Sequence, residues 1–434
     1  MPSRDELDRW DREHLWHPFC QMSEYEPLII ERAEGCTLYD LDGRAYLDGV
    51  SSLWCNVHGH HHPRLGEAIR RQLEKVAHCT MLGASNPTTI ELARRLVELA
   101  PVGLNHVFFA SDGSSAVEVA LKMAFQYWQQ RPDPRPRKTK YVALGDAYHG
   151  DTLGSVSVGG VARFHALFEP LLFDVLRLPC PSGALEQHVQ QAERLLAEHH
   201  EEIAALVIEP LVQCAAGMVV HPRGYLRALR ELTKKYDVLL IADEVAVGFG
   251  RTGTMFACEQ EGVSPDFLCL GKGLTAGYLP MAATLATTDV WNAFLGRYAD
   301  SKQFFHGHTF SGNPLAAAVA LESLNVFRDE RVLESLTKKI VWMSRALATL
   351  GQHEHVGRVR QCGMIAGIEL VADKPSNTPY PWEQARGLEV CRRARDRGVL
   401  LRPLGNVLVV MPPLAIREQE LDRIFAAIVA SLND

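Results

Sequence analysis

Short apolar runs alternate along most of the chain with stretches in which apolar residues recur at helical spacing. The runs predict strands that are buried on both faces, because apolar residues follow one another without polar alternation. They cover residues 106–110, 140–144, 205–209, 238–242 and 267–270. Helices are expected between them, among others at residues 116–129, 185–200 and 225–236. This alternation is typical of an α/β fold with a mostly parallel sheet flanked by helices.

The C-terminal part of the chain has a different pattern. Short strands are expected within residues 358–371, 398–403 and 407–411, and a helix over 417–432. Proline-rich polar stretches at 131–138 and 373–382 predict surface loops. We therefore expect an N-terminal segment (1–60) that packs with the small domain, a large α/β domain (61–330) and a small C-terminal α+β domain (331–434).

Composition narrows the class of protein. The chain has 434 residues, of which 47% are hydrophobic and 22% charged, as in ordinary globular proteins. A net charge of -7 does not favour nucleic acid or anionic membranes as partners. We find no apolar stretch that could span a bilayer and no apolar core of a signal peptide near the N-terminus. The 10 cysteines lack paired spacing, which predicts reduced thiols in a cytoplasmic enzyme.

Two charged residues stand directly at the ends of predicted strands. Asp243 ends one apolar run, and Lys272 follows the next run after a single glycine. Ligands of open α/β sheets bind outside the carboxyl ends of the strands. An amine for a Schiff base and a carboxylate for a pyridinium nitrogen are what pyridoxal phosphate requires. A structural ion pair would also explain Asp243, and a surface position would explain Lys272, but Gly271 and Gly273 disfavour the latter.

Other predicted strands end in residues that suit the same cofactor. Gly113 and Ser114 begin a helix, where free N–H groups and the helix dipole favour a phosphate, although ordinary capping would also account for this segment. Tyr148 could lie on a cofactor ring or merely pack against its neighbours. Glu209 is expected to be a solvated carboxylate.

Two further motifs are weaker. Residues 248–253 match the dinucleotide fingerprint G-x-G-x-x-G, but Asp243 and Glu244 intervene after the strand and no clear helix follows. A nicotinamide dehydrogenase is therefore a less favoured alternative, and a non-catalytic binding module is less favoured still. The histidine-rich residues 58–62 match no zinc spacing, so no metal site is expected. Pro63 begins a helical pattern, which predicts a turn with exposed imidazoles before it.

From about Trp16 to its end, the sequence resembles the class III aminotransferases, which are fold-type I pyridoxal-phosphate transferases. The most specific segments are residues 239–253 and 270–273. The resemblance implies a large domain with a mostly parallel sheet flanked by helices and a smaller α+β domain. It also implies a pyridoxal 5'-phosphate cofactor, small-molecule substrates and a homodimer.

The resemblance also implies individual roles. Lys272 forms the Schiff base, Asp243 holds the pyridine nitrogen and Thr309 reaches the phosphate of the partner subunit's cofactor. Lys272, Asp243 and Tyr148 are the expected catalytic residues. The expected cofactor-binding residues are Gly113, Ser114, Tyr148, Asp243, Val245, Lys272 and Thr309. The expected substrate-binding residues are Phe19, Trp54, Tyr148 and Arg402.

Several segments resemble the branch of the family that converts 8-amino-7-oxononanoate to 7,8-diaminononanoate in biotin biosynthesis, namely residues 15–19, 51–54, 148–152, 306–310 and 402–405. Members of that branch that take the amino group from S-adenosylmethionine typically have other residues at Phe19, Leu53 and His308. These replacements resemble the members that use L-lysine, so both donors stay open. The alternative is another class III aminotransferase, acting on an ω-amino acid or a diamine.

Overall fold

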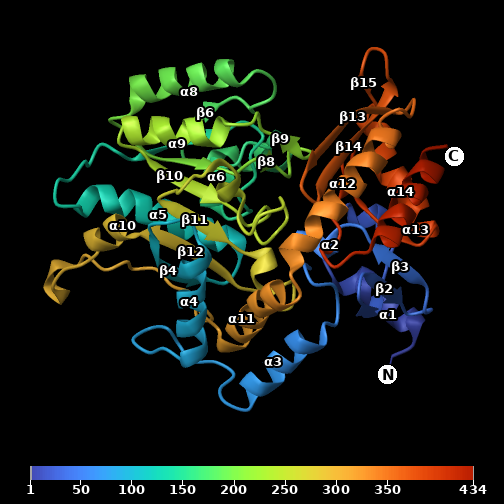
Figure 1. The fold of residues 1–434 in the computed structure, drawn as a ribbon, viewed down its shortest axis with the longest axis horizontal. Coiled ribbons are helices and arrows are strands. Elements are labelled where there is room, and N and C mark those ends of the chain that lie inside the picture. Colours follow the sequence, from blue (N-terminus) through green and yellow to red (C-terminus); the bar gives the residue numbers. More distant parts are fainter. Residues whose placement is uncertain (1, 434) are drawn as a thin grey trace.

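The computed structural model describes residues 2–433, and within them a seven-stranded sheet forms the centre of the molecule (Figure 1). Its strand order is β4-β12-β11-β10-β7-β5-β6, in which β12 alone runs antiparallel to its neighbours. The bounds are β4 (Leu104–Ala110), β5 (Lys140–Leu144), β6 (Val175–Leu178), β7 (Ile203–Ile208), β10 (Leu239–Asp243), β11 (Phe267–Leu270) and β12 (Ala282–Thr287). The predicted mostly parallel sheet is therefore confirmed.

Helices cover both faces of this central sheet, which explains the uninterrupted apolar runs. On β10, Leu239 and Ile241 belong to the cluster formed with the apolar face of α5, whereas Leu240 and Ala242 belong to the other cluster, which includes residues of α8, α9 and α11. The helices around the sheet are α3 (Pro63–Leu73), α4 (Pro87–Leu99), α5 (Gly113–Gln130), α6 (Leu153–Val158), α7 (Ala162–His165), α8 (Leu185–His199), α9 (Tyr225–Lys235), α10 (Thr288–Ala293) and α11 (Pro314–Asp329).

A second group of elements combines both ends of the chain. The C-terminal strands pair in the order β13-β14-β18-β17, while β16 pairs in parallel with β3 from the N-terminal segment. Figure 1 accordingly shows the first strands beside the last helices. The bounds are α1 (Arg4–His14), β1 (Ile30–Glu34), β2 (Thr37–Asp40), β3 (Ala45–Asp48), α2 (Ser51–Trp54), α12 (Val332–Leu350), β13 (Val356–Cys362), β14 (Ile365–Asp373), β15 (Thr378–Pro379), α13 (Arg386–Asp396), β16 (Val399–Leu400), β17 (Arg402–Leu404), β18 (Val407–Val410) and α14 (Glu418–Asn433). A short hairpin, β8 (Val212–Gln213) and β9 (Val219–Val220), lies beyond β7.

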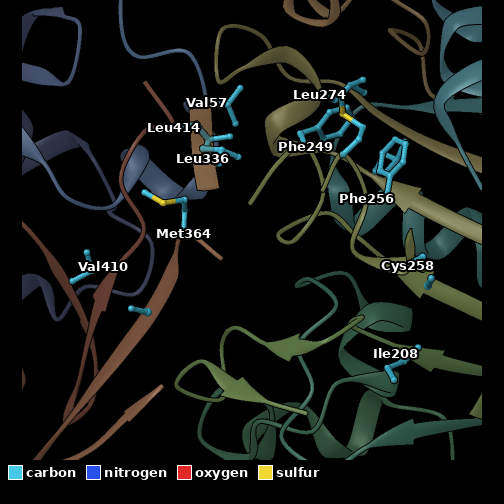
Figure 2. Packing of buried hydrophobic residues seen from close by; sticks show 14 of the residues in the cluster. Val57, Ile208, Phe249, Phe256, Cys258, Leu274, Leu336, Met364, Val410 and Leu414 are labelled. Carbon is cyan, nitrogen blue, oxygen red and sulfur yellow. The ribbon is translucent and has the colours of Figure 1, made fainter. Parts of the chain in front are cut away.

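One hydrophobic cluster joins the two groups. It includes Phe249 and Phe256, from the segment after β10, and Leu336 and Leu414, from the C-terminal elements (Figure 2). All four side chains are fully buried. Because protein interiors are close-packed, this shared core fixes the C-terminal elements against the ends of the sheet strands.

The expected turn of exposed histidines is wrong for His58. Its ring is buried and packs against Phe327, and Nε2 lies 3.0 Å from the hydroxyl of Ser323. Burial lowers the pKa of His58 to about 3. The helix α11 covers this segment, which local sequence cannot reveal. Within residues 2–433 there is no helix long and apolar enough to cross a membrane and no cluster of side chains that could hold a metal ion.

Candidate active site

Asp243 and Lys272 lie at the same edge of the central sheet, on neighbouring strands. β10 and β11 are parallel, and Asp243 stands opposite Cys269, three residues before Lys272. Asp243 is buried and Lys272 is half-buried. The lysine has a φ of +40°, a conformation that favours glycine, and its amine makes no hydrogen bond or ion pair within residues 2–433. The sequence correctly places a free amine and a carboxylate at adjoining strand ends.

Two groups fix the carboxylate of Asp243. Oδ1 accepts a hydrogen bond from the backbone N–H of Val245 at 3.0 Å, and Oδ2 lies 2.7 Å from Nδ1 of His149. His149 is fully buried, and its other ring nitrogen has no hydrogen-bond partner in the described chain. Sequence reasoning assigned no role to His149. The available signal was its position, directly after Tyr148 beyond a strand end.

The beginning of α5 forms an anion cradle beside these groups. Asp112 caps the helix by accepting from the N–H of Ser115 at 2.9 Å, so the capping interpretation is also correct. The N–H groups of Gly113 and Ser114 have no hydrogen-bond partner among residues 2–433. A Cβ on Gly113 would lie 2.5 Å from a methyl group of Val245, so only glycine permits this close approach. The two free N–H groups and the helix dipole together favour a phosphate.

The loop after β5 carries Tyr148 into the site. The N–H of Tyr148 donates to Oε1 of Glu209 at 3.1 Å, and its hydroxyl donates to Asp151 at 2.8 Å. Burial, followed by the nearby Asp151, raises the pKa of Tyr148. The loop also approaches α5 closely, because a Cβ on Gly150 would lie 2.0 Å from the hydroxyl of Ser114. Gly150 has a φ of +121°, which further requires glycine.

The expectation of a solvated Glu209 is wrong. Its carboxylate is buried, and it accepts hydrogen bonds from the N–H groups of Tyr148 and Cys214, the latter at 3.0 Å. Burial raises the pKa of Glu209 to about 7. Glu209 is buried because the loop after β5 and the turn before Cys214 both fold over the end of β7, a tertiary arrangement that local sequence does not show. Glu209 thereby holds the backbone of Tyr148 in place.

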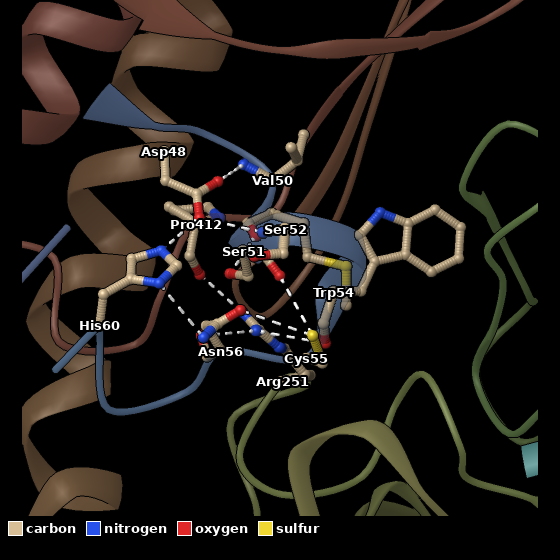
Figure 3. Close-up of polar contacts among 11 residues, drawn as sticks. Asp48, Val50, Ser51, Ser52, Trp54, Cys55, Asn56, His60, Arg251 and Pro412 are labelled. Atoms are coloured by element: carbon tan, nitrogen blue, oxygen red, sulfur yellow. Dashed lines mark hydrogen bonds and ion pairs between the residues drawn. The ribbon is translucent and has the colours of Figure 1, made fainter. Parts of the chain in front are cut away.

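The glycine-rich residues 248–253 do not form a dinucleotide loop. They form turns, with positive φ at Gly250 and Gly253, and a short 3-10 helix follows at Ala257–Glu261. Arg251 is buried within them and donates to the backbone carbonyls of Trp54, Asn56 and Pro412 (Figure 3). Burial lowers the pKa of Arg251 to about 10. The motif therefore serves to join the sheet to the N-terminal and C-terminal segments.

The predicted substrate residues have different surroundings. Trp54 is buried, and its ring centre is 4.8 Å from the amine of Lys272. Phe19 is 58% exposed and packs edge-on against Phe164, which in turn packs edge-on against Tyr148. Trp54, Phe19 and Tyr148 thus reach the site directly or through one ring.

Arg402 and Thr309 are less connected to the other predicted residues. Arg402 is half-buried on β17, where its backbone pairs with that of Val409, and its guanidinium makes no ion pair or hydrogen bond within residues 2–433. The neighbouring Leu404 packs on the cluster that contains Trp54. Thr309 is exposed and makes no hydrogen bond to any other predicted site residue in the described chain. The structure therefore brings most of the predicted set together but leaves Thr309 on the surface.

These groups fit pyridoxal phosphate. The unpartnered amine of Lys272 suits its aldehyde, the fixed carboxylate of Asp243 suits its pyridine nitrogen, and the cradle at Gly113 and Ser114 suits its phosphate. The fit rests on the free N–H groups and on the space that a Cβ on Gly113 would fill.

Comparisons with known proteins agree with this geometry. A family model described as "Aminotransferase class-III" matches residues 20–432. An adenosylmethionine-8-amino-7-oxononanoate aminotransferase from Nitratidesulfovibrio vulgaris is 55% identical over 95% of this chain and 79% of its own length. The crystal structure of an aminotransferase of the same name from Methanocaldococcus jannaschii has a TM-score of 0.95 at 43% identity and 99% coverage of both chains. An omega transaminase from Pseudomonas jessenii, solved in complex with PMP, has a TM-score of 0.93 at 34% identity, covering 99% of this chain and 98% of its own.

Proposed function

Because the chain belongs to the class III aminotransferases, we propose that it aminates 8-amino-7-oxononanoate to 7,8-diaminononanoate in biotin biosynthesis, with pyridoxal 5'-phosphate as cofactor. The observation that carries the proposal is the similarity over nearly the whole chain to relatives that bear the name of this reaction, at 43–55% identity. The positions of Lys272 and Asp243 at adjoining strand ends support the same chemistry.

Each residue of the site has a proposed part in the transfer. Bound pyridoxal phosphate supplies an electron-accepting ring for the negative charge left on a substrate carbon. Asp243, oriented by His149, would keep the pyridine nitrogen protonated. The Nζ of Lys272 would take the proton from the substrate carbon as a general base and return it as a general acid.

The remaining predicted residues are assigned to binding the cofactor and orienting the ketone substrate. The N–H groups of Gly113 and Ser114 would hold the phosphate, and Val245 and Tyr148 would contact the cofactor ring. Trp54 and Phe19 offer apolar walls for the carbon chain of the ketone. The unpartnered guanidinium of Arg402 suits its carboxylate through two parallel hydrogen bonds.

The amino donor is S-adenosylmethionine or L-lysine. The names of the relatives favour the first. Phe19, Leu53 and His308 favour the second, since Phe19 lacks the hydroxyl that members using S-adenosylmethionine typically present.

The proposal includes a cytoplasmic homodimer in which Thr309 reaches the partner's cofactor phosphate. The exposure of Thr309 supports this, together with the exposed neighbours Phe305 and Phe310. It also includes the division into segments 1–60, 61–330 and 331–434, which the pairing of β3 with β16 supports.

The test is to incubate purified protein with 8-amino-7-oxononanoate and either S-adenosylmethionine or L-lysine, and to measure the mass of the product. We expect 7,8-diaminononanoate with one donor. The second candidate, an ω-amino acid or diamine aminotransferase, is favoured by the likeness to omega transaminases at 33–34% identity. Amination of such carbonyl acceptors in place of 8-amino-7-oxononanoate would support it and contradict the proposal.

A further inference from the structure

The backbone of residues 50–56 is strained where it passes Lys272. Ser51, Ser52 and Trp54 all have positive φ, at +52°, +59° and +66°. Residues other than glycine rarely have a positive φ. Such backbone conformations persist only when surrounding contacts impose them. The contacts that impose this conformation are therefore part of how the site is built.

One set of contacts comes from Asp48. Its Oδ1 accepts from the N–H of Val50 and its Oδ2 from the N–H of Ser52, both at 3.0 Å (Figure 3). The side chain of Asp48 is completely buried. A buried carboxylate requires such hydrogen bonds, so its position and the turn of the backbone determine one another.

His60 completes the environment of this carboxylate. Its Nε2 lies 2.8 Å from Oδ2 of Asp48, and the side-chain amide of Asn56 lies 3.4 Å from its Nδ1. The amide donates to Nδ1, so the proton of a neutral ring is on Nε2 and points at Asp48. His60 therefore links the beginning of the strained segment to its end.

Arg251 holds the segment from another side. It donates to the carbonyls of Trp54 and Asn56 at 3.4 and 3.2 Å and is itself anchored on the carbonyl of Pro412 at 2.6 Å. Figure 3 shows the indole of Trp54 pointing away from Asp48 and His60. Within residues 50–56, the polar contacts of Asp48 and Arg251 thus involve only the backbone. The indole ring of Trp54 remains available to contact Lys272 and the substrate.

We propose that Asp48, assisted by His60, is a positioning residue that sets the place of Trp54 beside Lys272 and so determines how tightly the ketone substrate binds. Neither Asp48 nor His60 contacts the reacting groups. They act by stabilising a backbone conformation that directs the Cβ of Trp54 towards the amine. The inference rests on the proposed function for the identity of the ketone.

The test is a double-mutant cycle on the holoenzyme with Asp48→Asn and Trp54→Phe. Asp48→Asn is expected to raise KM for the ketone about tenfold, as for one lost hydrogen bond, and to change kcat by less than about twofold. In the Trp54→Phe background the same substitution is expected to raise KM by less than about twofold. Amide hydrogen exchange at residues 50–56 should become faster, with little change in β10.

Controls keep the outcomes distinct. His60→Gln goes through the same cycle and replaces Asp48→Asn if that variant does not fold. His61→Asn is the matched control, since this ring is exposed and asparagine tolerates its φ of +54°. An equal rise of KM in both backgrounds, or unchanged exchange at residues 50–56, would overturn the inference. If the wild-type protein does not aminate 8-amino-7-oxononanoate, the proposed function fails by itself, and the cycle is run on the ketone that it does aminate.

Discussion

A 2.7 Å hydrogen bond joins Asp243 to His149, although the two residues are 94 positions apart in the chain. Both side chains are buried, and the far nitrogen of His149 has no partner within the described chain. The bond prevents rotation of the carboxylate, whose other oxygen is held by the N–H of Val245. His149 therefore determines the direction in which Asp243 faces its ligand.

Replacing His149 by phenylalanine should weaken cofactor binding. The carboxylate of Asp243 would lose one of its two protein hydrogen bonds, and a bond to a charged group contributes about 1.5–3 kcal/mol. We expect the Kd for pyridoxal phosphate to rise about 10- to 100-fold in an absorbance titration. His14→Gln, at an exposed position in α1, should leave it unchanged. Wild-type affinity in His149→Phe would show that Asp243 is oriented by other groups.

Lys272→Ala should abolish turnover, because it removes the amine that stands just beyond the end of β11. The variant should also lose the yellow colour of the protein-bound Schiff base. Borohydride reduction followed by mass spectrometry checks this, and the wild-type protein should carry the label on the peptide with Lys272. Colour that borohydride fixes covalently to the alanine variant would refute the assignment.

Gly113→Ala should impair cofactor binding and stability, since its Cβ would lie 2.5 Å from Val245. Overpacking of this kind costs about 1–3 kcal/mol, and the shift would also displace the free N–H groups. Gly66 in α3 offers a matched control, because its Cβ would meet only the end of the Arg70 side chain at 3.7 Å. Gly66→Ala should stabilise by about 0.5–1 kcal/mol through helix propensity. In denaturant unfolding without cofactor, the free energy of unfolding should fall for Gly113→Ala and rise for Gly66→Ala.

Arg402→Met should raise KM for a ketone that carries a carboxylate about a hundredfold, the equivalent of about 3 kcal/mol. Arg402→Lys should recover only part of this loss, because an ammonium cannot make two parallel hydrogen bonds. Steady-state kinetics with the corresponding ketone that lacks the carboxylate provide the control. A similar loss for both ketones would indicate that Arg402 supports the fold of β17 instead.

Stability should fall below neutral pH in part because of His221. Both ring nitrogens are buried without a partner in the described residues, and burial lowers its pKa to about 3. The folded protein keeps this ring neutral while the unfolded chain protonates it below about pH 6.5, so stability is lost as pH falls. At pH 5 the loss is about 2 kcal/mol. His221→Phe keeps the edge-on contact with Tyr225 and should remove this part of the difference between pH 7 and pH 5 in denaturant melts. An unchanged pH dependence would contradict the assignment.

The sequence by itself determined the type of fold and the two central groups of the site. Apolar runs such as residues 267–270 are local features, and the edge of a parallel sheet collects whatever follows its strands. The structure accordingly has β5 and β11 at the expected bounds, with Asp243 and Lys272 side by side.

The tertiary structure alone decided which polar groups are buried and which partners they have. Glu209, expected to be solvated, lies under two loops, and His58, expected to be exposed, lies under α11. Arg251 reaches Trp54 from 197 positions away. Such contacts depend on where distant segments meet, whereas hydrophobic periodicity records only the neighbours along a single helix or strand.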